Sequence, residues 1–335
     1  MKASILIPIF NEVGFIENCV NSIISFVEDQ SNIELLLIDG GSNDGTLEII
    51  QDLSIKHPCI RVLHNPNKIQ SSALNIGIKE STGEFILRLD AHSKYSGTYI
   101  RNCISFMELS SSDVANVGGA IITRPGRNTL VAKTISFVLQ EKFGVGNSAF
   151  RTESITKEMD VETVPFGCFR RSCLDEIGYF DEDLERGEDL ELNKRLIDSG
   201  KRIIISPDIQ SIYYSRPTFL SFIIQAFRNG FFVTNNLSLK NIFHKQRHFM
   251  PLAFLIFVII FISSLTWSNG EEYSYIDQIL IFISFLYLFI ASFVSLKISL
   301  KNRNPAYLLT IPIFLFCLHI SYGVGSLFGL TGRKL

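Results

Sequence analysis

The sequence changes character near His248, and this change limits the chain to a two-part architecture. Before that point polar and apolar residues mix, whereas after it three long apolar stretches follow one another: 249–267, 279–296 and 307–330. Each stretch approaches the roughly 20 apolar residues that an α-helix needs to cross a bilayer. Three such stretches are hard to bury in a soluble core of a 335-residue chain. They are therefore interpreted as about three membrane helices.

The charges around these stretches predict an orientation. Basic residues precede the first stretch and follow the second, whereas acidic residues separate the first two. These are Lys240, Lys245, Arg247, Lys297, Lys301 and Arg303, against Glu271, Glu272 and Asp277. The positive-inside rule then places the N-terminal part in the cytoplasm. Three crossings would leave the basic tail Arg333-Lys334 outside, so a third stretch that turns back within the membrane is the alternative.

The first hundred residues alternate between strand and helix patterns. Short β-branched and aliphatic runs predict strands, and the stretches between them predict helices. The strand runs are 4–9, 34–38, 60–63 and 84–89, and the helical stretches are 12–27, 46–56 and 69–80. This alternation is typical of an α/β fold with a mostly parallel sheet. Ligands of such sheets bind beyond the carboxyl ends of the strands, which here are residues 8–12, 39–46 and 90–92.

The second half of this region is less regular. Residues 143–163 form a polar stretch that predicts a mobile loop near the site, and 174–200 looks helical at both ends. Residues 203–205 and 212–214 predict two further strands. Residues 3–10 run directly into Asn11 and Glu12, as a first buried strand would and a signal peptide would not.

Bulk properties exclude some classes of protein. A net charge of −2 gives no reason to expect nucleic acid as a partner. The six cysteines are scattered, with no CxxC pair and no histidine at zinc-ligand spacing. We therefore expect reduced thiols in a cytosolic domain.

Two clusters of polar residues follow predicted strands. In the run from Asp39 to Thr46, glycines allow a ligand to approach the backbone, and the carboxylates of Asp39 and Asp44 can accept hydrogen bonds from a base or ribose. The equally good alternative is a turn in which Asp44 and Thr46 only cap a helix. In the second cluster, Asp90 and His92 lie two residues apart. Their oxygen and nitrogen atoms are suitable ligands for a Mn²⁺ or Mg²⁺ ion that bridges a diphosphate. A histidine in a turn is, however, more often a surface or core residue.

A third cluster, Glu188-Asp189, begins a helix whose apolar positions include Leu192 and Leu196. The helix dipole favours an ionised carboxylate there, and such a group can take a proton from an acceptor hydroxyl. The alternative is a plain preference for acidic residues at helix N-termini.

In combination and order, these clusters resemble inverting glycosyltransferases of family 2, which have the GT-A fold. The matching motifs are Pro8-Ile9-Phe10-Asn11-Glu12, the run from Asp39 to Thr46, Asp90-Ala91-His92 at the family's DxD position, Glu188-Asp189 at its ED position and Gln225-Ala226-Phe227-Arg228 at its abbreviated QxxR position. Three features look most like succinoglycan-type exopolysaccharide transferases: the histidine in Asp90-Ala91-His92, the loop from Phe143 to Arg151 and the run from Val164 to Arg171.

The resemblance implies a role for each matching residue. Asp39 would contact the base of a UDP-sugar, while Pro8, Glu12 and Asp44 line or shape that pocket. Asp90 would bind the metal–diphosphate, with His92 as a second ligand whose contact is direct, through water or absent. Asp189, supported by Glu188, would be the general base of a single inverting displacement. Arg228 with Gln225 would stabilise the departing diphosphate.

The resulting hypothesis is a multi-pass enzyme of the inner cell membrane with a cytoplasmic catalytic domain. It would transfer a sugar to a polyprenyl-linked or glycan acceptor in exopolysaccharide or cell-surface glycan synthesis. The predicted parts are a GT-A domain (1–215), an amphipathic interfacial segment (216–248) and a membrane region (249–335). A processive polysaccharide synthase and a non-catalytic partner in a polysaccharide assembly complex are the alternatives.

Overall fold

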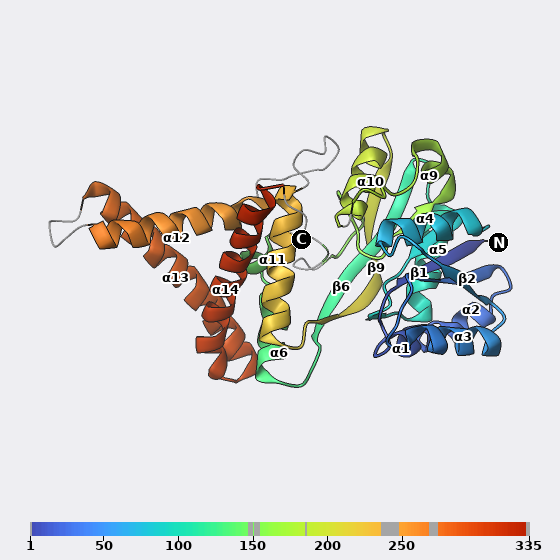
Figure 1. Cartoon of the computed structure of the whole chain (residues 1–335), viewed down its shortest axis with the longest axis horizontal. Coiled ribbons are helices and arrows are strands. Elements are labelled where there is room, and N and C mark those ends of the chain that lie inside the picture. Colours follow the sequence, from blue (N-terminus) through green and yellow to red (C-terminus); the bar gives the residue numbers. More distant parts are fainter. Residues whose placement is uncertain are drawn as a thin grey trace. The chain divides into compact units, whose positions relative to one another are not determined.

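A computed structural model describes residues 2–146, 150, 155–184, 186–235, 248–267 and 274–332 (Figure 1). These residues form two compact units. The first holds 2–122, 150, 155–184 and 186–213, and the second holds 123–146, 214–235, 248–267 and 274–332. Several residues on which sequence predictions rest lie outside the described part of the chain. These are Asn147, Glu185, Lys240, Lys245, Arg247, Glu271, Glu272, Arg333 and Lys334.

The first unit is built on one mixed sheet with the strand order β3-β2-β1-β4-β8-β6-β9-β5, and β7 pairs with β9. Its strands are β1 Ala3–Ile9, β2 Ile33–Asp39, β3 Ile60–His64, β4 Phe85–Arg88, β5 Ser93–Lys94, β6 Val114–Pro125, β7 Met159–Asp160, β8 Cys168–Arg170 and β9 Arg202–Ser215. The four strands from β3 to β4 are parallel. Strand β8 is antiparallel to both β4 and β6, and β9 is antiparallel to β5 and β7. The parallel half therefore brings the carboxyl ends of β1, β2 and β4 to one edge.

Helices cover both faces of this sheet. The helices of the unit are α1 Ile16–Asn21, α2 Ile24–Glu28, α3 Thr46–Lys56, α4 Gln70–Glu80, α5 Gly97–Leu109, α9 Arg171–Ile177 and α10 Glu188–Asp198. Alternate residues of β1 separate the two faces, because Ile5 and Ile7 pack with α1, α2, α3 and α5, whereas Leu6 packs with α4, α9 and α10. The alternating βαβ order places one hydrophobic core on each side of the sheet.

Two local sequence predictions are wrong in detail. The helix expected over 12–27 is two helices, α1 and α2, separated at Ser22 and Ile23. The Ser22 hydroxyl donates to the Cys19 carbonyl and accepts from the Tyr95 amide, a local bonding pattern that competes with a continuous helix. The two strands expected at 203–205 and 212–214 are one strand, β9. The stretch 143–163 includes β7, and its residues 147–149 and 151–154 lie outside the description.

The second unit is helical. It contains α6 Leu130–Val138, α7 Lys142–Val145, α11 Phe219–Asn235, α12 Met250–Trp267, α13 Tyr275–Asn302 and α14 Ala306–Gly329. Among the described residues, α13 and α14 are long and apolar enough to cross a membrane, and α12 contains a shorter apolar helix, Met250–Ser264. At 1.5 Å per residue, α13 is about 42 Å long, which exceeds the roughly 30 Å hydrocarbon core.

Helix α11 packs closely along α14 (Figure 1). Small residues make this approach, because a Cβ at Gly230 would lie 1.9 Å from the Tyr322 carbonyl oxygen and one at Gly325 would lie 2.0 Å from that of Phe227. The Thr234 hydroxyl also donates to the Ser326 carbonyl at 2.6 Å. Close backbone contact with hydrogen bonds across the helices is the usual way that helices associate in lipid.

Candidate active site

The loops after β1 and β2 are tied together by hydrogen bonds. The Asn11 amide donates to the Ser42 hydroxyl at 2.9 Å, and the Asn43 amide donates to the Asn11 side chain at 3.0 Å. The Glu12 amide donates to the Thr46 hydroxyl at 2.9 Å. These contacts, made across 31 to 34 residues of sequence, bring the predicted nucleotide-binding residues Pro8, Glu12, Asp39 and Asp44 to one region.

Asp39 is buried at the end of β2 and organises the loop that follows it. Its Oδ2 accepts from the Gly41 amide at 2.8 Å, and its Oδ1 accepts from the Ser42 hydroxyl at 2.6 Å. Gly41 adopts a φ of 79°, which glycine tolerates without strain. The Ser42 amide also donates to both oxygens, at 3.1 Å to Oδ2 and 3.3 Å to Oδ1. Asp39 therefore shapes this loop, and its contact with a base stays a prediction.

Asp44 links the two loops and also supports the start of α3. Its Oδ2 accepts from the Val13 amide at 3.2 Å, and its Oδ1 accepts from the Thr46 amide at 3.1 Å and from the Thr46 hydroxyl. The hydrogen bond from the Thr46 side chain is the main cause that lowers the pKa of Asp44. Asp44 therefore shapes the loops, and a nucleotide contact by this residue stays a prediction.

Asp90 and His92 follow β4. Tyr95 fixes the backbone there, since its hydroxyl oxygen accepts from the Asp90 amide at 2.8 Å. The His92 Nδ1 lies 3.3 Å from Oε1 of Glu12, so the loops after β1 and β4 also meet. Side chains of both Asp90 and His92 remain partly exposed, at 20% and 32%. A ligand arriving at the carboxyl edge of the sheet can therefore reach both.

Asp189 lies in the first turn of α10, which begins at Glu188 as the sequence predicts. Arg88 connects it to the edge of the sheet: Nη1 of Arg88 donates to Oδ2 of Asp189 at 2.6 Å, and Nη2 lies 3.0 Å from Oδ1 of Asp90. Glu188 is buried, with Oε1 3.8 Å from the same Nη2. The predicted base and the predicted donor-binding carboxylate therefore share one guanidinium.

The two oxygens of Asp189 have different surroundings. Oδ1 is buried and has no hydrogen-bond partner among the described residues. Burial raises the pKa of Asp189 from 3.8 to about 7, with the positive charge of Arg88 acting against it and the negative charges of Glu188 and Asp90 adding to it. We place the pKa of this carboxyl above its ordinary value because one cation faces three acids. A carboxyl with a pKa near neutrality is suited to proton transfer.

Gln225 and Arg228 lie on α11 in the second unit. They are three residues apart and therefore share one side of the helix. Their predicted role toward the departing diphosphate stays a prediction.

Sequence reasoning gave Arg88 no role, although the residue stands directly beside a predicted site. The available signal was its position: a charged residue in the strand Phe85–Arg88, which is buried throughout, requires a partner of opposite charge. Gln70, the first residue of α4, was also missed. When its amide oxygen faces Arg88, it accepts from Nε at 3.3 Å and from Nη2.

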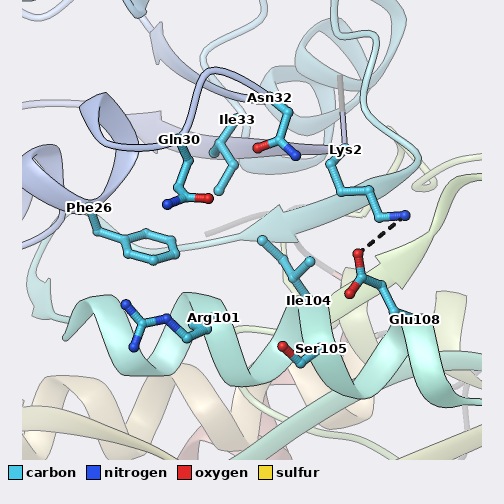
Figure 2. A pocket seen from close by; sticks show the side chains of 9 residues that line it. All are labelled: Lys2, Phe26, Gln30, Asn32, Ile33, Arg101, Ile104, Ser105 and Glu108. Carbon is cyan, nitrogen blue, oxygen red and sulfur yellow. Dashed lines mark ion pairs between the residues drawn. The ribbon is translucent and has the colours of Figure 1, made fainter.

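A separate hollow lies at the amino ends of β1 and β2 (Figure 2). It has a volume of about 160 Å³, and its lining includes Phe26, Arg101 and a Lys2–Glu108 ion pair of 3.2 Å. None of the predicted site residues lines it. It is thus distinct from the cluster at the carboxyl edge.

Comparisons with known proteins identify several glycosyltransferases that this chain resembles. The chain is 29% identical over 328 residues to a Methanococcus voltae transferase named dolichyl N-acetyl-alpha-D-glucosaminyl phosphate 3-beta-D-2,3-diacetamido-2,3-dideoxy-beta-D-glucuronosyltransferase, covering 96% of this chain and 95% of that protein. It is 28% identical over 251 residues to the succinoglycan biosynthesis protein ExoA of Rhizobium meliloti, covering 74% of each.

A solved structure shares the fold. The mannosyltransferase PcManGT of Pyrobaculum calidifontis, determined with GDP-Man and Mn²⁺, superposes with a TM-score of 0.59 at 15% identity, covering 95% of this chain and 85% of that one. The predicted GT-A fold is confirmed by this likeness. The sequence profile described as "Glycosyl transferase family 2" matches residues 4–178 of the 335. Since that match covers more than half of the chain, the protein belongs to glycosyl transferase family 2.

Proposed function

We propose that the protein transfers a sugar from a UDP-sugar to a lipid-linked or polysaccharide acceptor at a membrane, with inversion of the anomeric carbon. The single observation that carries this proposal is the buried Oδ1 of Asp189, which lacks a hydrogen-bond partner among the described residues. A buried acceptor without a partner is costly, and an acceptor hydroxyl would supply the missing donor. Asp189 is then the base, and Glu188 supports it.

The donor would bind along the loops at the carboxyl edge of the sheet. Asp39 would contact the uracil base, with Pro8, Glu12 and Asp44 shaping the pocket. Asp90 would face the diphosphate. Gln225 and Arg228 would meet the charge of the leaving nucleoside diphosphate, for which a planar multi-donor cation is suited.

The residues after β4 fit a divalent cation that arrives with its substrate. Among the described residues no group of three or more His, Cys, Asp and Glu side chains is arranged for a metal. Mg²⁺ and similar ions, however, commonly take one or two protein ligands and complete their shell with substrate phosphates and water. Asp90 and His92 offer one oxygen and one nitrogen donor, both partly exposed. Bound there, Mn²⁺ or Mg²⁺ would supply charge neutralisation for the diphosphate.

Attachment to a membrane is supported by the second unit. Large apolar side chains of α13 point outward, among them Phe285 and Phe289, which are 67% and 70% exposed. An exposed apolar surface of this kind is expected against lipid rather than water. The named similarity to a dolichyl-phosphate transferase extends over 95% of that protein and agrees with a lipid-linked acceptor.

The decisive experiment is Asp189→Asn in membranes that contain the full chain. We expect the rate of sugar transfer to fall by about 10³-fold because the base is lost, while UDP binding remains. Asp198→Asn is the matched control, since Asp198 lies on the same helix, is exposed, and forms an ion pair with Lys194 at 2.6 Å. Transfer at the wild-type rate by Asp189→Asn would overturn the proposal, and release of GDP instead of UDP would correct the donor.

A further inference from the structure

Arg88 is a cation enclosed by groups from three parts of the first unit. It ends β4, its side chain is 9% exposed, and it contacts Asp90, Glu188 and Asp189. The amide oxygen of Gln70, at the start of α4, accepts from its Nε at 3.3 Å. All three nitrogens of the guanidinium are thus engaged, and the two terminal nitrogens point to different carboxylates.

This arrangement differs from that of a buried arginine that only supports the fold. Arg170, on β8, is also largely buried, but it donates to the carbonyl oxygens of Val114 and Met107. Arg88 instead pairs with the carboxylates of Asp189 and Asp90, for which different roles in sugar transfer are proposed. Its contact with Asp189 leaves Oδ1 without a partner while it fixes Oδ2.

We propose that Arg88 is a positioning residue that holds Asp189 and Asp90 in their working orientations through one guanidinium. The inference rests on the proposed role of Asp189 as base. A planar fork with donors at fixed angles can hold two carboxylates at once, which the single ammonium group of lysine cannot reproduce. Lysine at this position would keep the charge and lose the geometry.

The first test is Arg88→Lys in the full-length membrane enzyme. We expect kcat to fall by about 100-fold, because a displacement of about 1 Å at a reacting group has that effect, while KM for the UDP-sugar changes much less. Arg170→Lys is the matched control and should change kcat little, since Arg170 donates to backbone carbonyls and the acid it contacts, Glu84 at 4.0 Å, is not a site residue. Equal kcat values for Arg88→Lys and the wild type would overturn the inference.

The second test is a double-mutant cycle that combines Arg88→Lys with Asp189→Asn. If Arg88 acts through Asp189, Arg88→Lys should cost little once Asp189→Asn is present, because residues that work as a unit are strongly non-additive. Losses that simply multiply would overturn the inference while leaving Asp189 as the base. A fully active Asp189→Asn enzyme would instead remove the proposed function itself.

A third variant covers the case in which Arg88→Lys does not fold. Gln70→Ala keeps every charge and removes only the amide that accepts from Nε of Arg88. We expect kcat to fall by about tenfold, roughly the effect of one hydrogen bond to a charged group, with an unchanged KM for the donor. An unchanged kcat in this variant would count against Arg88 as a positioning residue.

Discussion

The surroundings of the Asp189 carboxyl determine how the activity should depend on pH. Oδ2 accepts from Arg88 at 2.6 Å, and Oδ1 is buried without a partner in the part of the chain that the structure describes. Burial, opposed by Arg88, raises the pKa of the group to about 7. A base with that pKa changes its protonation state within the physiological range.

The expected consequence is a loss of activity on the acid side. Below about pH 7 an increasing fraction of Asp189 is protonated and cannot accept a proton, so kcat/KM should fall about tenfold per pH unit. The measurement is kcat/KM from pH 5.5 to 8.5 at saturating Mn²⁺. The residual rate of Asp189→Asn should lack this acid limb. A flat profile for the wild type across that range would contradict the assignment.

The role of His92 in cation binding can be tested against His57, a second histidine of the same unit. Both His92 and His57 lie beside a glutamate, Glu12 at 3.3 Å and Glu28 at 2.6 Å, but only His92 follows β4 next to Asp90. If His92 contributes to cation binding, His92→Ala should raise the Mn²⁺ concentration for half-maximal activity by about 10-fold or more. His57→Ala should leave the Mn²⁺ titration unchanged. An unchanged titration in His92→Ala would remove that residue from the site.

At the scale of elements, the sequence correctly predicted the helices and strands that have a local apolar pattern. Strands β1 to β4 and helices α3 and α4 match their predicted ranges within about two residues, because each has a clear apolar period and a turn on either side. The gap between α1 and α2 was missed, since it depends on Ser22 contacting Tyr95, 73 residues away. The Arg88–Asp189 contact spans 101 residues and leaves no local pattern.

The contact between α11 and α14 makes a prediction of its own. A Cβ at Gly325 would lie 2.0 Å from the Phe227 carbonyl oxygen, so Gly325→Ala must separate the two helices. Overpacking of this kind costs about 1–3 kcal/mol, and we expect a lower unfolding temperature in detergent. Leu327→Ala, at an exposed position of the same helix, is the control and should change it little. Equal unfolding temperatures for the wild type and Gly325→Ala would contradict this packing.

At the scale of the whole molecule, the apolar C-terminal region was predictable and its internal organisation was not. Hydropathy alone indicates the helices, but nothing in the sequence showed that residues 123–146 belong with them in the second unit. That association depends on side chains such as Ile135 and Val138, which pack with Ile311 and Leu315 of α14. Such long-range packing has no periodic signature. The predicted domain boundaries at 215 and 248 stay predictions.

The orientation in the membrane is testable with single cysteines. With a cytoplasmic catalytic unit and a crossing by α12, a cysteine at Asn269 should react with an impermeant thiol reagent on intact cells. A cysteine at Arg303, in the turn between α13 and α14, should react only after permeabilisation. The wild-type chain sets the baseline. Reaction at Arg303 but not at Asn269 would mean that the opposite orientation is correct.

The hydrogen bonds that join the loops after β1 and β2 affect the thermodynamics of donor recognition. Asn11, Glu12 and Val13 contact Ser42, Thr46 and Asp44 through hydrogen bonds that involve only residues of the protein itself. The loss of conformational freedom in these segments therefore occurs when the protein folds, and binding need not order them again. Calorimetry of UDP binding should then report only a small entropic penalty from the protein. Asn11→Ala, which loses the bond from the Asn43 amide, should bind UDP with a less favourable entropy.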